Sequence, residues 1–329
     1  MSEKKAISWR RLDNAAKIFP STSEKTDTRV FRFSCELYES VDPEVLQKAA
    51  DKTLKDFPHF LSIMKKGWFW YYLESCDLKL TVHEENSKPC SQLYFPGEKN
   101  LLLDISYYKN RINLEIYHVL SDGTGAIQFL RTMICNYLTE IHGSEWEKKP
   151  VIDYDASIAE RSADSFQKYY KKVKGGKNKR IKRAYNIKGE KRETEDLRMI
   201  EGILSAREAV DAAHKYHTTL TVYLTAVFIK AISEEMTVRK RKYPIVLMVP
   251  VNLRNYFDSE TARNFFGMIA VKYDFKTQPD DFEEIIKTVA ETFKTELTKE
   301  RLEVRMNGLA ALEHNPFVRI APLEFKNIC

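Results

Sequence analysis

The chain has 329 residues, of which 43% are hydrophobic, 30% charged and 12% aromatic, with only 11 Gly and 11 Pro. This composition is typical of a globular protein and excludes a disordered or collagen-like chain, while the length favours two domains or two lobes. The net charge of +6 comes from one tract, Lys168 to Arg192, where twelve Lys and Arg stand against a single acid, Glu190. The rest of the chain is mildly acidic.

The N-terminus, MSEKKAISWRRLD, has no apolar stretch behind its charges and is not a secretory signal. No apolar run reaches the roughly 18 residues of a membrane span. We therefore expect a cytoplasmic chain. The five cysteines contain no CxxC pair, which favours reduced thiols over disulfides or a structural zinc site.

The first half alternates strand and helix patterns. Apolar alternation predicts a strand over Arg29–Tyr38, and Asp42-Pro43 then caps a helix to about Phe57. Further strands are expected at His59–Met64, Trp68–Leu73, Leu78–His83, Leu101–Tyr107 and Ile112–His118. An apolar stripe at helical spacing covers Gly125–Ile141, so His118 ends a strand and Gly123 lies where a helix begins.

The second half repeats this character after a Lys-rich stretch. We expect a strand over Asp196–Leu204, a helix from a capping box at Ser205 to about Tyr216, and a second helix over Thr219–Met236. Strands at Ile245–Val251 and Phe266–Phe275 and a helix over Asp280–Glu303 follow. The prediction is an α/β protein with two α+β, two-layer lobes, 1–143 and 196–329, joined by a basic linker or crossover, 144–195.

One histidine stands in a pattern that can carry chemistry, His118-Val119-Leu120-Ser121-Asp122-Gly123. A histidine at the end of a rigid strand can present a neutral imidazole as a general base. Asp122 can shape the loop, and Gly123 can let the backbone pass close to a ligand. The alternative is structural: a half-buried His118, Asp122 as a helix N-cap and Gly123 as a turn residue.

A second pattern follows in the later half, Val249-Pro250-Val251-Asn252-Leu253-Arg254 and then Asn264-Phe265-Phe266-Gly267-Met268. Together the two patterns resemble the superfamily of CoA-dependent acyltransferases that includes chloramphenicol acetyltransferase and the condensation domains of peptide synthetases. The opening run Arg11–Pro20 and the residues around the histidine motif are most similar to bacterial alcohol acetyltransferase-like proteins.

The resemblance implies that His118 takes the proton from an acceptor as it attacks an acyl thioester. It implies a structural pair of Asp122 with Arg254, because a buried carboxylate needs a partner that a guanidinium can supply. Acyl-CoA, with acetyl the expected acyl group, would be a cosubstrate and a small-molecule alcohol the acceptor. No bound cofactor and no metal would be needed, since the thioester is already activated.

Three features depart from the family pattern. Tyr117 stands where condensation domains have a first histidine, which favours a free-standing acyltransferase over peptide-bond formation on carrier proteins. The D-F-G-W-G signature of the plant branch is absent. The sequence also ends at Cys329, where relatives generally continue, so we expect either a truncated chain or a relative with a shortened second lobe.

Other residues allow two interpretations each. Ser121, Thr124 and Asn252 are candidate substrate or oxyanion contacts or else turn and cap residues, and Phe265, Phe266 and Met268 could line an acyl channel or belong to the core. His214 and His217 fit surface positions better than a metal site.

The function itself also leaves alternatives. Besides alcohol acylation, the chain could form an amide or ester on a carrier-bound thioester, or bind ligands without turnover. Nucleic-acid binding would rest on the basic tract alone, which matches no nucleic-acid motif. That tract is either a solvated linker or a surface that attracts the phosphates of CoA.

Overall fold

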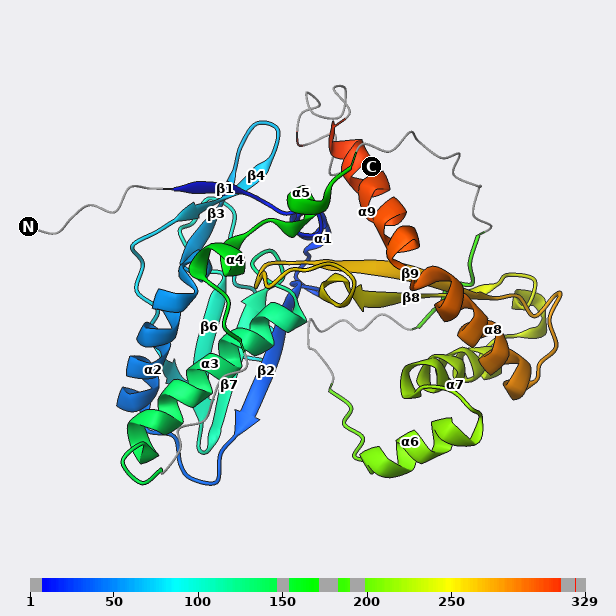
Figure 1. Cartoon of the computed structure of the whole chain (residues 1–329), viewed down its shortest axis with the longest axis horizontal. Helices are drawn as coiled ribbons and strands as arrows, with labels where there is room; N and C mark the ends of the chain where they lie inside the picture. The colour runs from blue at the N-terminus through cyan, green and yellow to red at the C-terminus, as the bar shows by residue number, and fades with distance from the viewer. Residues whose placement is uncertain (1–7, 147–153, 172–182, 190–198, 315–322, 324–329) are drawn as a thin grey trace, which may run out of the picture. The chain divides into compact units, whose positions relative to one another are not determined.

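The computed structural model describes residues 8–146, 154–171, 183–189, 199–314 and 323. The chain forms two compact units. Unit 1 comprises Met1–Lys171, Phe257–Phe266 and Leu309–Cys329, and unit 2 comprises Lys172–Tyr256 and Gly267–Gly308. Both contain helices and strands, so the predicted α/β class is confirmed (Figure 1). The lobe boundaries drawn from the sequence stay predictions.

Unit 1 contains two sheets. A three-stranded sheet has the order β1-β4-β3, and a four-stranded sheet has the order β2-β7-β6-β5. The strands are β1 (Trp9–Arg11), β2 (Val30–Glu36), β3 (Ser62–Lys66), β4 (Tyr71–Ser75), β5 (His83–Glu84), β6 (Leu103–Tyr108) and β7 (Arg111–Tyr117). The longer helices are α2 (Pro43–Asp56) and α3 (Gly123–His142). Shorter ones are η1 (Ala16–Ile18), α1 (Phe19–Thr22), η2 (Pro58–Phe60), α4 (Ile158–Ser162) and α5 (Ser165–Tyr169).

The two faces of the four-stranded sheet differ. On β2, Phe31 and Phe33 lie opposite Ile116 and Leu114 of β7, and α2 and α3 cover this apolar face (Figure 1). The residue between them, Arg32, lies opposite Glu115 on the other face, which is polar. Because side chains alternate along a strand, one register gives the sheet a core face and a polar face.

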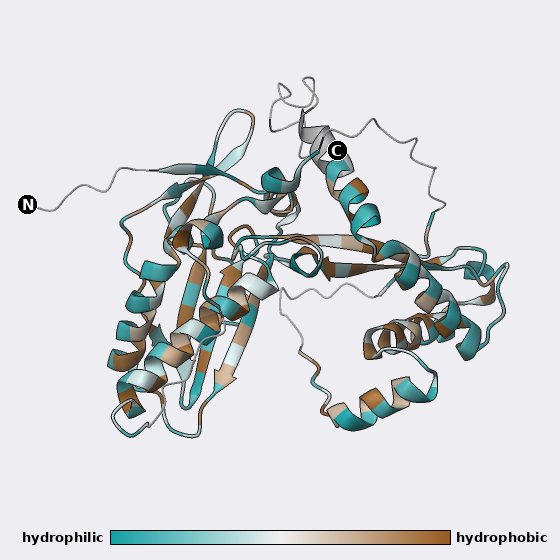
Figure 2. Cartoon of the chain, viewed as in Figure 1, coloured by the Kyte–Doolittle hydropathy of each residue, from teal (hydrophilic) through white to brown (hydrophobic). Residues whose placement is uncertain are grey.

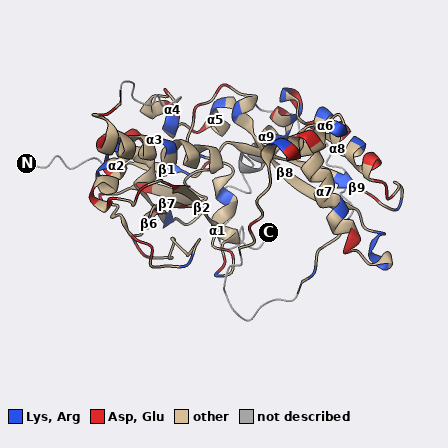
Figure 3. Cartoon of the chain, turned by 90° about the horizontal axis from the view of Figure 1, so that it is seen from below, with Lys and Arg blue, Asp and Glu red and all other residues tan. Residues whose placement is uncertain are grey.

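Unit 2 contains a two-stranded sheet of β8 (Ile245–Asn252) and β9 (Phe266–Tyr273). Its helices are α6 (Ala206–Lys215), α7 (Leu220–Glu234), η3 (Val238–Lys240), η4 (Leu253–Asn255), α8 (Phe282–Glu296) and the part of α9 (Lys299–His314) up to Gly308. Helix α7 packs on α8 and β8 and is apolar over much of its length (Figure 2). Basic and acidic residues lie together on α6 and α8 (Figure 3).

Several predicted elements are wrong in place or extent. Residues 78–82 form no strand, since β5 covers only His83 and Glu84, and residues 199–204 are exposed coil where a strand was expected. Helices α4 and α5 lie within the stretch 144–195 and belong to unit 1, and the role of that stretch as a linker or crossover stays a prediction. The helix expected over 280–303 is two helices, α8 and α9. Most of the basic tract lies outside the described residues.

Candidate active site

His118 stands in a short turn between the end of β7 and the start of α3. Its backbone N–H donates to Arg29 O at 3.0 Å, which extends the β2–β7 pairing by one residue. Five residues later the chain is helical, with Asp122 as N-cap. The strand-to-helix placement expected for His118 and Gly123 is therefore confirmed.

Aromatic rings surround the half-buried imidazole of His118. Phe19 stacks on it with centroids 4.3 Å apart and an interplanar angle of 20°. Phe31 approaches edge-on at 5.0 Å, and Phe266 lies at 5.7 Å. These contacts fix the plane of the ring and remove much of its surrounding water.

This environment keeps the imidazole neutral at pH 7. Burial lowers the pKa of His118 below its ordinary value of 6.5. Hydrogen bonds to its own backbone carbonyl, to Asn264 and to the backbone of Ser121, and the charge of Asp122, raise the pKa but do not outweigh burial. A neutral imidazole with a pKa below 6.5 is available as a base at physiological pH.

Asn264 is the principal polar partner of the ring. Its Oδ1 lies 3.0 Å from His118 Nδ1, and its Nδ2 donates to His118 O at 3.0 Å. Asn264 is 1% exposed, and behind it lies the equally buried carboxylate of Asp13. Neither residue has an expected role from the sequence alone, although Asn264 directly precedes Phe265 and Phe266, the candidates for an acyl channel. The sequence signal for Asn264 is a polar side chain directly before an apolar strand.

The carboxylate of Asp122 binds two backbone N–H groups. Its Oδ1 accepts from Gly125 N at 3.0 Å, and its Oδ2 accepts from Phe265 N at 2.8 Å. The first bond caps α3, and the second ties the start of that helix to the Phe257–Phe266 segment. This geometry fits the structural role predicted for Asp122.

The residues that follow His118 in the motif differ in burial and in hydrogen bonding. Ser121 is fully buried, and its hydroxyl donates to Ala262 O at 2.6 Å. Gly123 and Thr124 form the first turn of α3 and are partly exposed. The hydroxyl proton of Ser121 is thus committed to the protein, whereas the structure assigns no hydrogen-bond partner to Thr124 among the described residues.

Phe265 and Phe266 have different surroundings. Phe265 is buried against Phe166, Tyr169 and Phe257, with ring centroids 5.2, 6.1 and 6.0 Å away, whereas Phe266 faces His118. Of the two rings, only Phe266 lies beside His118.

Asn252 and Arg254 belong to unit 2. Asn252 is the N-cap of η4, and its Oδ1 accepts from Arg254 N at 3.1 Å and from an Arg254 Nη at 3.2 Å. Asn252 therefore shapes the turn that carries Arg254. The pairing of Asp122 with Arg254 joins residues of different units and stays a prediction.

Three further features bear on what the site can hold. A cavity of about 620 Å³ lies in unit 1 between β1, the β3–β4 turn and α5, and the residues described as lining it do not include His118. Within the described ranges, no three His, Cys, Asp or Glu side chains gather closely enough to bind a metal ion. None of the described helices has the length and apolar character of a membrane span.

The fold is similar to that of several solved structures. No family model and no curated protein matches the sequence. Among solved structures, the chain is similar to TRI101 of F. graminearum complexed with coenzyme A and deoxynivalenol, with a TM-score of 0.62, 13% identity, and coverage of 96% of this chain and 80% of the other.

Two further structures agree. Polyketide synthase associated protein 5 from Mycobacterium tuberculosis gives a TM-score of 0.57 at 14% identity, covering 90% of this chain and 75% of that protein. The first condensation domain of the CDA synthetase gives 0.57 at 13% identity, covering 89% and 75%. The resemblance stated from the two sequence motifs is thus confirmed for the fold. The chain therefore has a fold similar to that of TRI101, of polyketide synthase associated protein 5 and of the condensation domain.

Proposed function

We propose that the protein transfers an acyl group, acetyl in the first instance, from a CoA thioester to an alcohol, with His118 as general base. One observation carries the proposal. A neutral histidine lies at the junction of β7 and α3, flanked by aromatic rings and held by Asn264, in a fold shared with a protein crystallised with coenzyme A. This is the arrangement that deprotonation of a hydroxyl requires.

The chemistry follows from the two ring nitrogens. Nδ1 is directed to Asn264, so Nε2 is the atom that would take the hydroxyl proton as the alcohol oxygen attacks the thioester carbonyl. The new C–O bond forms a tetrahedral intermediate. When that intermediate collapses, the C–S bond breaks and the CoA sulfur leaves, recovering the proton from the imidazolium. No external oxidant or reductant is involved.

The donor that stabilises the oxyanion comes from a short set of candidates. Ser121 donates its hydroxyl proton to Ala262 O, which makes it a poor donor to an intermediate. Thr124, in the first turn of α3, and Asn252, beside Arg254, are the other predicted candidates. A donor that stabilises the oxyanion more than the substrate carbonyl would lower the barrier directly.

A second candidate function is acyl transfer from a carrier-bound thioester, which the structural likeness to condensation domains favours. Consumption of free acetyl-CoA separates the two. Turnover of free acetyl-CoA supports the first proposal, and turnover only of a carrier-bound thioester supports the second. Tight binding of either without any turnover would indicate a binding protein.

The direct test compares His118→Ala with the unmodified chain. We expect release of CoA thiol from acetyl-CoA in the presence of an alcohol panel, and a fall of roughly 100-fold or more in His118→Ala, the usual contribution of a positioned base. His214→Ala is the matched control, because His214 is an exposed histidine near the end of α6. Undiminished turnover in His118→Ala would overturn the mechanism.

The pH dependence has a defined sign. Because burial lowers the pKa of His118, the active neutral form is present above that lowered pKa and is lost only as the pH falls through it, on the acid side of the ordinary histidine value. The profile of kcat/KM against pH should therefore be flat near pH 7 and decline on the acid side. A rate that rises as the pH falls through this range would contradict the assignment of His118 as base.

A further inference from the structure

The side-chain amide of Asn264 lies between His118 and Asp13. On one side, its Oδ1 is 3.0 Å from His118 Nδ1. On the other, its Nδ2 donates to Asp13 Oδ2 at 3.4 Å, as well as to the backbone carbonyls of His118 at 3.0 Å and Val119 at 3.4 Å. Both Asn264 and Asp13 are 1% exposed. The three side chains thus form a buried row that ends at the proposed base.

The surroundings determine which end of the amide faces the ring. An amide NH2 can only donate, and the groups beside Nδ2 are two carbonyl oxygens and a carboxylate, which accept. Turning the amide over would place Oδ1 against these acceptors. The acceptor Oδ1 must therefore face the imidazole, and His118 Nδ1 must carry the proton that Oδ1 accepts. Nε2 is then left with its lone pair.

Asp13 is itself held firmly. Its Oδ1 accepts from Ala16 N at 2.8 Å, at the start of η1. Its Oδ2 lies 3.6 Å from an Nη of Arg263, which in turn donates to Arg11 O at 2.8 Å. The carboxylate is thus fixed by backbone and by a guanidinium, and it presents an acceptor to Asn264 that cannot rotate away.

We propose that Asn264 is a positioning residue that keeps His118 in the tautomer protonated on Nδ1, and that Asp13 locks the orientation of the Asn264 amide. The proposal rests on the assignment of His118 as general base, since it explains how Nε2 stays unprotonated and able to accept the acceptor's proton. It assigns functions to two residues 251 positions apart in sequence.

The decisive measurement is the tautomer of His118 by NMR on the full chain labelled with ¹⁵N-histidine, with His118→Ala to assign its signals. In the unmodified protein we expect one tautomer, with Nδ1 protonated and Nε2 unprotonated. In Asn264→Ala, Nδ1 loses its side-chain acceptor and the ring keeps only backbone carbonyls as partners, so the proton can move to Nε2 and a second population should appear. This readout needs no substrate, so it stands whether or not the chain transfers acyl groups.

Two further variants separate specific from general effects. Asn113→Ala removes another fully buried asparagine of unit 1, whose Oδ1 accepts from Ser34 Oγ at 2.8 Å on the polar face of the sheet. It should leave the tautomer of His118 unchanged. Asp13→Asn keeps the shape but removes the charge, so we expect a smaller second population than in Asn264→Ala.

Activity provides the second readout. With acetyl-CoA and an accepted alcohol, Asn264→Ala should lower kcat about 10- to 100-fold with little change in KM, since Asn264 is 1% exposed and would act through His118, and the loss is part of what a positioned base contributes. A higher KM with an unchanged kcat would overturn the positioning role. If unmodified His118 is protonated on Nε2, or keeps its tautomer in Asn264→Ala, the proposal for Asn264 is wrong. An unchanged tautomer in Asp13→Asn overturns the role of Asp13 alone.

Discussion

Two glycines in the first turn of α3 meet very different surroundings. A Cβ on Gly125 would overlap the backbone oxygen of Ala262 and the hydroxyl of Ser121, whereas a Cβ on Gly123 would meet only Phe33 Cζ at 3.7 Å. Gly125 is therefore the glycine required by close packing within the protein, whereas the close approach to a ligand expected at Gly123 stays a prediction. Gly125 lets the start of α3 press against the Phe257–Phe266 segment that carries Asn264.

This contrast makes a matched pair of variants. Gly125→Ala should lower the free energy of unfolding by about 3 kcal/mol, because a backbone carbonyl must move to make room. Gly123→Ala should leave it unchanged or raise it by up to about 1 kcal/mol, since alanine is the better helix residue. Urea unfolding of both variants measures the difference. Equal destabilisation would contradict the packing described here.

Asp122→Asn tests whether the motif aspartate is structural. The carboxylate accepts from two backbone N–H groups, Gly125 N and Phe265 N, and an asparagine can accept from only one of them. We expect a loss of about 1–3 kcal/mol in the free energy of unfolding, the cost of an unsatisfied buried donor. Turnover per folded molecule should fall much less than in His118→Ala. Unchanged stability with a slower chemical step would show that Asp122 acts in catalysis.

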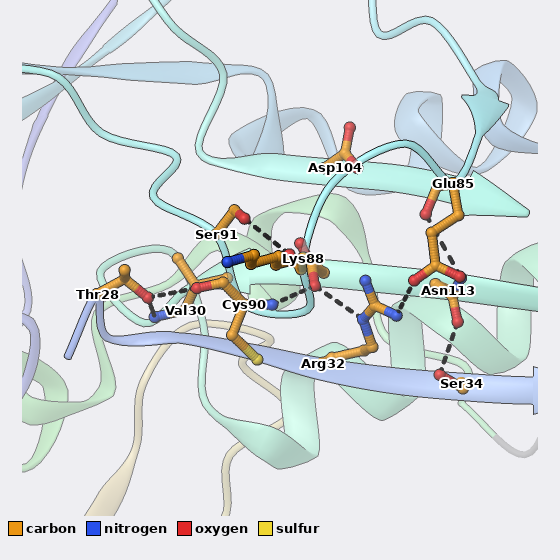
Figure 4. A network of polar contacts seen from close by, with 12 residues as sticks. Thr28, Val30, Arg32, Ser34, Glu85, Lys88, Cys90, Ser91, Asp104 and Asn113 are labelled. Carbon is orange, nitrogen blue, oxygen red and sulfur yellow. Dashed lines mark hydrogen bonds and ion pairs between the residues drawn. The ribbon is translucent and has the colours of Figure 1, made fainter. Parts of the chain in front are cut away.

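The polar face of the four-stranded sheet carries ion pairs that join β2 and β7 to the segment after β5. Arg32 of β2 binds Glu115 of β7, with Nε 2.8 Å from Oε1, and also binds Glu85, which follows β5 (Figure 4). Glu85 in turn binds Arg111 of β7 at 2.7 Å, and Cys90 N donates to Glu115 at 2.6 Å. The network holds the segment after β5 across the sheet.

The network should give the fold an acid-sensitive component. Although burial opposes it, hydrogen bonds and charge from Arg32 and Arg111 keep the pKa of Glu85 below its ordinary value of 4.5. A lowered carboxyl pKa contributes stability above the pKa of the unfolded state, and this contribution is lost as the pH falls through the folded pKa.

Glu85→Gln measures that component. We expect it to lower the free energy of unfolding by about 2 kcal/mol at pH 7, within the range for hydrogen bonds to charged groups, and by progressively less below about pH 4.5. Glu84→Gln, at the exposed neighbouring position of β5, is the control and should have little effect at either pH. A Glu85→Gln deficit that persists undiminished in acid would show that the charge of Glu85 is not what stabilises the sheet.

Elements with local signals were predictable from the sequence, and those that depend on distant partners were not. Helices α2 and α7 begin where Asp42 and Thr219 cap them, because caps and apolar periodicity act within a few residues. Residues 199–204 are apolar enough to predict a strand, but they pair with no strand in the described part of the chain, and pairing cannot be predicted from one segment.

The candidate site, too, was predictable only where its residues are neighbours in sequence. His118 and Asp122 belong to one contiguous motif and were identified. The contact of His118 with Asn264 spans 146 residues, and the orientation of that amide depends on Asp13, which is further away still. Only the folded chain brings these groups together, so their joint role in setting a tautomer has no signature in local sequence.

Charge is distributed unevenly over the chain, and this affects how an anionic cosubstrate would be bound. The body is mildly acidic, whereas Lys168 to Arg192 is strongly basic. CoA carries several phosphate charges, so a mildly acidic body would repel it at long range. A concentrated basic tract can reverse that repulsion and raise the rate of encounter, an effect that salt weakens.

The triple variant Lys174→Gln, Lys177→Gln, Lys179→Gln tests this role. We expect the KM for acetyl-CoA to rise roughly 3- to 10-fold at low salt and its salt dependence to flatten, while kcat stays unchanged because His118 and Asn264 are untouched. The control removes three charges from exposed positions of α2, Lys48, Lys52 and Lys55, so that net charge changes equally in both proteins. If both triple variants change KM equally, net charge alone accounts for the effect. If the first leaves KM and its salt dependence as in the unmodified chain, the tract is a solvated linker, because attraction that acts on the phosphates must weaken when the charges nearest to them are removed.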